Sequence, residues 1–266
     1  MQNIIAALRL FGFVGLSLTA MGFQSIILAT RLPGKNRVPH LYFRLVANLL
    51  AMRVNIDGEK PQNGPGLILA NHASWLDIVA MSAALPVVFV AKKEVRQWPF
   101  FGTLASLGGT IFIDRDRRQA TGQARNYMQS LMKQGARIVL FPEGTTSDGN
   151  RVLPFRSALL GAAADESAKN SIIPALIAYS GRYGLPMSRA DRNIYAWFGD
   201  MTLLGHLWRV VKSGPFDVTL RFYPAIAMEN GRKIACNVAE NLLRQELAKA
   251  LSGRLISPVS HGTNLR

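Results

Sequence analysis

Short apolar runs rich in β-branched residues alternate with helix-like stretches over most of the chain after residue 56. This alternation predicts an α/β fold in which a mixed sheet is flanked by helices. The expected strands are Gly66–Ala70, Val87–Ala91, Thr110–Ile113, Arg137–Phe141, Ile172–Ala178, Ile194–Phe198 and Val218–Tyr223. The expected helices are Trp75–Ala84, Gln119–Lys133, Ser157–Lys169 and Ile234–Leu251. Pro174 lacks a backbone N–H, so its run is expected to be an edge strand or to contain a bulge.

The first 56 residues have a different character. They contain no acidic residue, and the segment from Phe11 to Thr30 carries no charge. As a helix this segment would reach about 30 Å, the hydrocarbon thickness of a bilayer. We therefore expect residues 1–56 to form a membrane anchor or docking segment of helices with a basic end. A buried globular helix is the alternative, and the sequence leaves open whether residues 11–30 span the membrane or only dock on it.

The basic cluster that follows this apolar segment predicts that the rest of the chain lies on the cytoplasmic side of a bacterial-type inner or cell membrane. Residues 57–252 are then expected to form the main domain. Residues 253–266 show little periodicity and are expected to be a mobile tail.

The charge balance points to an anionic partner. The 266 residues include 31 Lys and Arg against 16 Asp and Glu, a formal net charge of +15. Because this charge accompanies an apolar segment and no nucleic-acid motif is visible, an anionic membrane or an acidic carrier is favoured over nucleic acid. The lone Cys236 excludes a disulfide framework and is expected to be a small core residue. The other histidines are scattered, so no metal site is expected.

Polar residues follow three of the expected strands. His72, Arg115 and Glu143 each come just after an apolar run. The carboxyl ends of neighbouring strands meet at one edge of an α/β sheet, so we expect these side chains to face one crevice. Asp77 comes five residues after His72. A carboxylate on one ring nitrogen fixes the histidine tautomer and leaves the other nitrogen as a general base. Alternatively, Asp77 only charges the first helical turn and His72 makes local hydrogen bonds.

The segment from Phe141 to Gly149 is the second candidate for chemistry. Gly144 permits tight backbone, and the hydroxyls of Thr145, Thr146 and Ser147 could cradle an anion. The alternative is an ordinary turn. The lysine of a phosphate-binding P-loop is missing, which disfavours nucleotide phosphotransfer. Arg115 carries a permanently charged guanidinium that can bind phosphate or carboxylate through two N–H groups. The alternative is that it only pairs with a neighbouring aspartate.

Taken in order, these segments resemble the glycerolipid and lysolipid acyltransferase family, including its lyso-ornithine lipid branch. Asn71-His72…Asp77 is similar to the H-x-x-x-x-D block, and Gly109–Arg115 to the second block. Phe141–Thr145 reads F-P-E-G-T like the third block, and Ile173-Pro174 matches the fourth. The resemblance covers roughly residues 66–180.

The resemblance implies a membrane-associated O-acyltransferase of membrane lipid biosynthesis. Such an enzyme moves a fatty acyl group from a thioester of acyl carrier protein or coenzyme A to the free hydroxyl of a lysolipid. No cofactor other than this co-substrate is expected. His72 and Asp77 would be catalytic. The implied acceptor-binding residues are Arg115, Glu143, Gly144, Thr145, Thr146 and Arg156. A structural role for Glu143, bridging Arg115, is the alternative.

One position departs from the family pattern. Lysophosphatidate acyltransferases commonly carry an arginine where this chain has Thr146. This difference leaves 1-acylglycerol-3-phosphate and lyso-ornithine lipid both open as acceptors, with a lean to the aminolipid, which carries a carboxylate and no phosphate. Two other classes remain: a non-catalytic basic module that binds anionic lipids, and a lipid hydrolase in which His72 activates water.

Overall fold

The computed structural model describes residues 2–35, 37–61, 64–114, 118–162 and 171–252. Over these residues the strands form one mixed sheet in the order β1-β8-β6-β2-β5-β3-β4, and two short strands, β7 and β9, pair with β6. The pairs β1–β8, β6–β2, β2–β5, β5–β3 and β3–β4 are parallel, whereas β6 runs antiparallel to β8, β7 and β9. The strands are β1 (Met52–Asp57), β2 (Gly66–Ala70), β3 (Val88–Lys92), β4 (Ile111–Ile113), β5 (Arg137–Leu140), β6 (Ser171–Arg182), β7 (Leu185–Pro186), β8 (Phe216–Phe222) and β9 (Ile226–Ala227).

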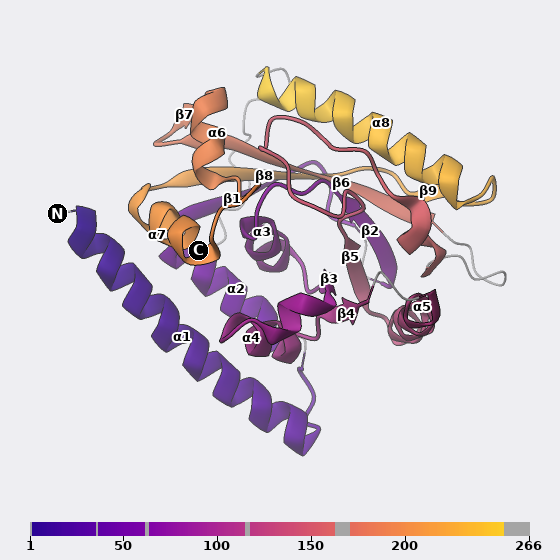
Figure 1. The fold of residues 1–266 in the computed structure, drawn as a ribbon, viewed down its shortest axis with the longest axis horizontal. Coiled ribbons are helices and arrows are strands. Elements are labelled where there is room, and N and C mark those ends of the chain that lie inside the picture. The colour runs from indigo at the N-terminus through magenta and orange to yellow at the C-terminus, as the bar shows by residue number, and fades with distance from the viewer. Residues whose placement is uncertain (1, 36, 62–63, 115–117, 163–170, 253–266) are drawn as a thin grey trace.

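Helices cover both faces of this sheet (Figure 1). They are α1 (Gln2–Thr30), α2 (Arg37–Leu49), α3 (Leu76–Ala84), α4 (Phe101–Leu107), α5 (Arg118–Lys133), α6 (Arg189–Tyr195), α7 (Leu203–Lys212) and α8 (Arg232–Leu251), with 3-10 turns η1 (Lys93–Gln97) and η2 (Ser157–Ala162). Successive residues of a strand point to opposite faces, so Ile68 packs into the core shared with α2 and α3, whereas Leu67 packs into the core shared with α5 and α8. The predicted α/β fold with a mixed sheet is confirmed.

The sequence prediction was wrong about the strand at Ile194–Phe198. Its first residues end α6, and no described strand covers the range. Ser188 caps this helix: its hydroxyl accepts a hydrogen bond from the backbone of Asp191, while the Asp191 carboxylate accepts one from the backbone of Ser188. This capping box stabilises a helix start and overrides the β-like composition of the apolar residues that follow.

Of the two alternatives for the Pro174 run, the edge strand was wrong, because β6 lies between β2 and β8 in the middle of the sheet. The register of β6 with β8 does shift between Tyr179 and Gly181, beyond the predicted run. On one side Pro174 is in register with Leu69 of β2. On the other side β9 pairs with β6 up to Ile172, and β8 pairs from Ala175 onward. Pro174 therefore lies where the antiparallel partner of β6 changes from β9 to β8. Its missing N–H interrupts neither the β6–β9 nor the β6–β8 pairing.

Two further boundaries differ from the prediction. Residues 52–56, assigned by sequence to the N-terminal segment, form most of β1 and pair with β8. The helix expected over 157–169 is a 3-10 turn over Ser157–Ala162, and residues 163–170 lie outside the described part, as does the tail 253–266. In α8 the buried side includes Cys236, as predicted, and Leu243, whereas Val238 is 47% exposed.

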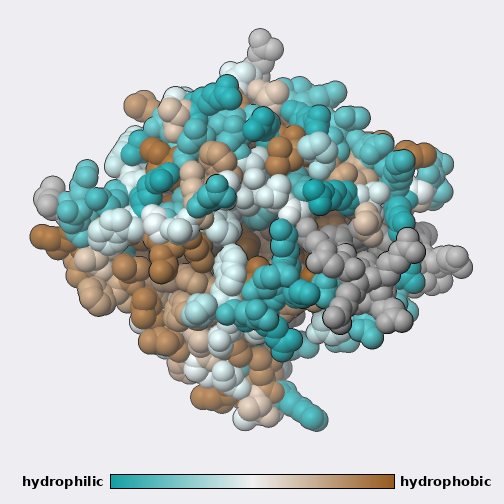
Figure 2. Space-filling model, viewed as in Figure 1, coloured by the Kyte–Doolittle hydropathy of each residue, from teal (hydrophilic) through white to brown (hydrophobic). Residues whose placement is uncertain are grey.

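Helix α1 lies along one side of the domain (Figure 1). Three of its polar side chains face inward: Arg9 donates to the carbonyl of Val211 in α7, the Ser17 hydroxyl lies 2.8 Å from that of Tyr42, and Gln24 donates to the carbonyl of Leu107. The outward face exposes large apolar side chains, including Ile4, Leu8, Phe11, Leu18, Phe23 and Ile26. Figure 2 shows brown, apolar surface on this side of the molecule. Among the described helices, α1 alone is long and apolar enough to cross a membrane by length and composition, with 17% of its most apolar window buried.

Candidate active site

The site lies where β2 ends. Asn71 and His72 follow the last residue of this strand, and the chain then turns into α3, which carries Asp77 in its first turn. The buried Asn71 amide fixes this end of the sheet, because it donates to the carbonyl of Ile177 in β6 and accepts from the Ile177 N–H. His72 is thereby held at the carboxyl edge of the sheet, as the sequence pattern predicted.

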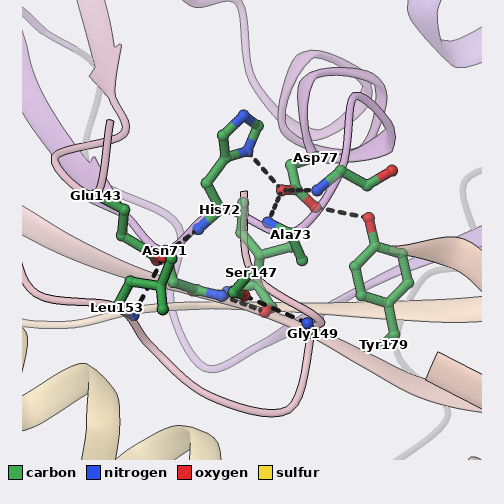
Figure 3. A network of polar contacts seen from close by, with 11 residues as sticks. Asn71, His72, Ala73, Asp77, Glu143, Ser147, Gly149, Leu153 and Tyr179 are labelled. Carbon is green, nitrogen blue, oxygen red and sulfur yellow. Dashed lines mark hydrogen bonds and ion pairs between the residues drawn. The ribbon is translucent and has the colours of Figure 1, made fainter. Parts of the chain in front are cut away.

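The side chains of His72 and Asp77 face each other (Figure 3). His72 Nδ1 lies 2.8 Å from Asp77 Oδ2. The Asp77 carboxylate is fully buried, and Oδ2 also accepts the backbone N–H groups of Ala73 and Ser74 at 2.7 and 2.9 Å. A carboxylate held in this way makes Nδ1 the protonated nitrogen and leaves Nε2 with a free lone pair. Asp77 does lie in the first helical turn, as the alternative required, but it also contacts His72.

The imidazole ring of His72 is held flat against Phe141. Their ring centroids are 3.9 Å apart and the planes differ by 9°. The His72 side chain keeps 17% of its surface exposed, and its far nitrogen points away from the polar network (Figure 3). Its backbone carbonyl also accepts the N–H of Ser147. The loop after β5 therefore fixes both the plane and the main chain of His72, while Nε2 remains able to meet a substrate.

The Glu143 side chain is buried, whereas a residue that binds substrate would have to be accessible to it. Its side chain is only 2% exposed. Oε1 accepts the backbone N–H of His72 at 2.8 Å, and Oε2 accepts that of Leu153 at 3.1 Å. Burial raises the pKa of this carboxyl to about 8, although both hydrogen bonds oppose the shift. These contacts give Glu143 a structural role, in which it ties the loop to the His72 turn through backbone groups. The bridge to Arg115 that the sequence analysis offered involves a residue outside the described part of the chain.

Four of the remaining predicted residues, Gly144, Thr145, Thr146 and Arg156, follow Glu143 along the same loop. Gly144 has a φ of +74°, a conformation that glycine adopts without strain. Thr145 is exposed and Thr146 is half-buried on the same loop. Arg156 is exposed, and its backbone N–H donates to the carbonyl of Pro142. These residues lie on the loop that is tied to His72 through Glu143 and through the backbone of Ser147. Arg115 lies outside the described residues.

Three contributors were not identified from sequence: the stacking ring of Phe141, the strand-bridging amide of Asn71, and Tyr179. The Tyr179 hydroxyl donates a hydrogen bond of 2.6 Å to Asp77 Oδ1. The first two stand beside predicted motif residues, which is the only signal that could have indicated them. Tyr179 is separated from Asp77 by 102 residues, and no local spacing links them. Over the described residues, no group of three or more His, Cys, Asp or Glu side chains could hold a metal ion.

A buried aspartate paired with a histidine at the carboxyl edge of an α/β sheet is an arrangement that could serve acyl transfer. Comparison with known proteins assigns the chain to the acyltransferases. An acyltransferase family model matches residues 52–178. Lyso-ornithine lipid O-acyltransferases from Brucella abortus and Rhizobium meliloti are 39% and 38% identical, over 95% and 91% of this chain and 99% and 84% of theirs. A 1-acyl-sn-glycerol-3-phosphate acyltransferase from Neisseria meningitidis is 33% identical over 71% of each chain.

The fold has a solved counterpart. The crystal structure of the 1-acyl-sn-glycerophosphate acyltransferase PlsC from Thermotoga maritima superposes with a TM-score of 0.65 at 18% identity, covering 94% of this chain and 97% of that one. The present chain belongs to the acyltransferase family that contains these lysolipid enzymes. The family resemblance stated from the sequence motifs is confirmed.

Proposed function

We propose that this acyltransferase moves a fatty acyl group from a thioester to the free hydroxyl of a lyso-ornithine lipid at a membrane surface. The observation that carries the proposal is the 2.8 Å contact between His72 Nδ1 and the buried Asp77 carboxylate, which leaves Nε2 as a base beside an open loop. The loop with Thr145, Thr146 and Arg156 is the region proposed to receive the acceptor head group.

The proposed reaction is a direct transfer. The acceptor hydroxyl attacks the thioester carbonyl carbon while its proton passes to Nε2 of His72, and Asp77 stabilises the resulting imidazolium. The tetrahedral intermediate then collapses, the carbon–sulfur bond breaks, and the thiolate takes the proton back from Nε2. General-base assistance of about 10²–10⁴-fold lowers the barrier by roughly 3–5 kcal/mol. Holding acceptor and donor in register contributes a comparable amount or more.

The choice of acceptor rests on position 146 and on the relatives. Lysophosphatidate acyltransferases commonly carry an arginine fork where this chain has a half-buried threonine. Binding an aminolipid carboxylate requires less positive charge than binding a phosphate. The absence of an arginine guanidinium at position 146 therefore disfavours the phosphate acceptor. The lyso-ornithine lipid O-acyltransferases from Brucella abortus and Rhizobium meliloti also match nearly the full chain. Arg156, together with Arg115, is the proposed ligand of the carboxylate.

We further propose that the domain docks on the cytoplasmic face of a bacterial cell membrane through the outer side of α1. Inward contacts of Arg9 and Gln24 near the two ends of α1 hold this helix along the domain, which favours docking over spanning. Replacing Phe11, which is 77% exposed, by Asp should weaken flotation with vesicles that contain anionic lipid. The matched control is Tyr127→Asp on the exposed side of α5.

One assay tests the reaction. Purified protein is incubated with labelled acyl carrier protein thioester or acyl coenzyme A and with lyso-ornithine lipid or 1-acylglycerol-3-phosphate. Diacyl product from the aminolipid supports the proposal, and its loss in His72→Ala ties the product to this site. Free fatty acid without diacyl product would indicate a hydrolase. Lipid binding without any turnover would indicate a non-catalytic module.

A further inference from the structure

The carboxylate of Asp77 accepts four hydrogen bonds, and they are divided unequally between its two oxygens. Oδ2 receives His72 Nδ1 and the backbone N–H groups of Ala73 and Ser74. Oδ1 receives the Tyr179 hydroxyl at 2.6 Å. Three of these donors come from the turn that carries Asp77 itself, whereas Tyr179 reaches it from β6. Figure 3 shows His72 and Tyr179 approaching the carboxylate from different sides.

The architecture fixes this tyrosine with respect to the base. Asn71, next to His72, is bonded through both atoms of its amide to Ile177, two residues before Tyr179. The register between β2 and β6 therefore sets the position of Tyr179 relative to His72. The tyrosine ring is buried and stacks on Tyr195, with centroids 6.2 Å apart and planes 9° apart. Burial, followed by the charge of Asp77, keeps the pKa of the Tyr179 phenol well above its ordinary value, so the phenol remains a donor.

We propose that Tyr179 is a positioning residue for acyl transfer: its hydroxyl holds the Asp77 carboxylate in the orientation that serves His72 and keeps the carboxylate ionised while the imidazolium forms. The inference rests on the proposed transfer reaction. A carboxylate that is buried and fully hydrogen-bonded does not need to reorganise when positive charge appears on the imidazole, which is how a preorganised site lowers a barrier. Without the phenol, Oδ1 of the fully buried Asp77 loses its only described donor.

Tyr179→Phe tests this role, because it keeps the ring and removes only the hydroxyl. Loss of one hydrogen bond to a buried charge predicts a fall in kcat of about 10–100-fold, with the KM for lysolipid changed by less than about twofold. Tyr195→Phe is the matched control: it removes a buried hydroxyl from the same aromatic stack, and that hydroxyl is not among the donors to Asp77. Its kcat should stay within about twofold of the wild type.

The pH profile separates positioning from simple packing. The hydrogen bond from the Tyr179 hydroxyl stabilises the ionised form of the Asp77 carboxylate relative to its protonated form. Removing the hydroxyl should move the acid limb of kcat/KM to higher pH. Glu143 is a second titratable group in contact with His72, and it is present in both the wild type and the variant. Replacing Tyr179 by 3-fluorotyrosine keeps the shape with a more acidic phenol and should move the limb to lower pH.

A double-mutant cycle completes the experiment. If Tyr179 acts through Asp77, Tyr179→Phe should change kcat by less than about twofold in an Asp77→Asn background. A wild-type kcat and an unmoved acid limb in both Tyr179→Phe and the fluorotyrosine protein would overturn the inference while leaving the transfer reaction intact. Absence of diacyl product from the wild-type protein would instead overturn the proposed function. If Tyr179→Phe fails to fold, the fluorotyrosine protein decides alone.

Discussion

The backbone nitrogen of His72 donates a hydrogen bond of 2.8 Å to Oε1 of Glu143, so the loop after β5 holds the candidate base by its main chain. Oε2 of the same carboxylate accepts the N–H of Leu153, which ties the far end of the loop to the same point. Glu143 therefore sets the distance between the His72 turn and the loop that carries Thr145 and Thr146.

Glu143→Gln should impair both activity and stability. An amide oxygen can accept only one of the two N–H groups, and the amide nitrogen then faces the other donor. We expect a loss of about 1–3 kcal/mol in the free energy of unfolding and a fall in kcat of about 10-fold or more. Urea unfolding and steady-state kinetics measure these quantities. Glu59→Gln makes the same chemical change on an exposed side chain and should alter neither. A fully active Glu143→Gln protein would show that these hydrogen bonds are dispensable.

The buried His206 should make the protein less stable in acid. Trp75 Nε1 donates to His206 Nδ1 at 2.9 Å, and burial, followed by the charge of Arg209, lowers the pKa of His206 to about 4. The unfolded chain binds a proton at its ordinary pKa of 6.5. The unfolded state therefore takes up more protons between pH 6.5 and 4, and stability present above pH 6.5 is lost as the pH falls through this range.

His206→Asn tests this linkage, because the amide oxygen can still accept the indole N–H of Trp75. The wild-type free energy of unfolding should decrease by up to about 3 kcal/mol from pH 6.5 to 4, and the variant should lose less over the same range. The difference between the two proteins should not vary with pH above pH 7.5. Parallel acid-side curves for the two proteins would assign the acid sensitivity to other groups.

Gly102 should not tolerate any side chain. A Cβ atom there would lie 2.2 Å from the carbonyl oxygen of Arg96, which is backbone and cannot move aside as a flexible side chain would. Gly102→Ala should therefore lower the free energy of unfolding by about 1–3 kcal/mol or more. Gly22→Ala on the exposed side of α1 is the matched control, since nothing lies within 4 Å of its Cβ position. Equal thermal midpoints for these two variants would contradict the prediction.

Thr146→Arg should shift acceptor preference toward phosphate. A guanidinium can form a bidentate, charge-assisted contact with phosphate, which predicts about a tenfold gain in kcat/KM for 1-acylglycerol-3-phosphate relative to lyso-ornithine lipid. Thr145→Arg places the same charge on the neighbouring, exposed position and controls for general attraction. The ratio of the two specificity constants is the readout. An unchanged ratio, or the same change in both variants, would remove position 146 from acceptor selection.

The sequence by itself indicated the class of fold and the identity of the candidate base. The strands before His72 and Glu143 are short apolar runs, and local periodicity is sufficient to reveal such runs. His72 and Asp77 are separated by one turn of chain, so local geometry already allows their contact. The order of the motif blocks along the chain was also enough to indicate the acyltransferase family, because this order is read from the sequence without knowledge of the fold.

Only the tertiary structure decided how the site is held together. Tyr179 reaches Asp77 because β6 lies next to β2, and strand adjacency is set by long-range packing that local composition does not encode. The same holds for Pro174, which is accommodated in a central strand because β9 gives way to β8 beside it. Glu143 reads as a substrate ligand in sequence, yet burial and two backbone donors turn its carboxylate inward. A hydrogen-bond partner that comes from a distant strand depends on which strands pair in the sheet. The spacing of nearby residues in the sequence cannot predict it.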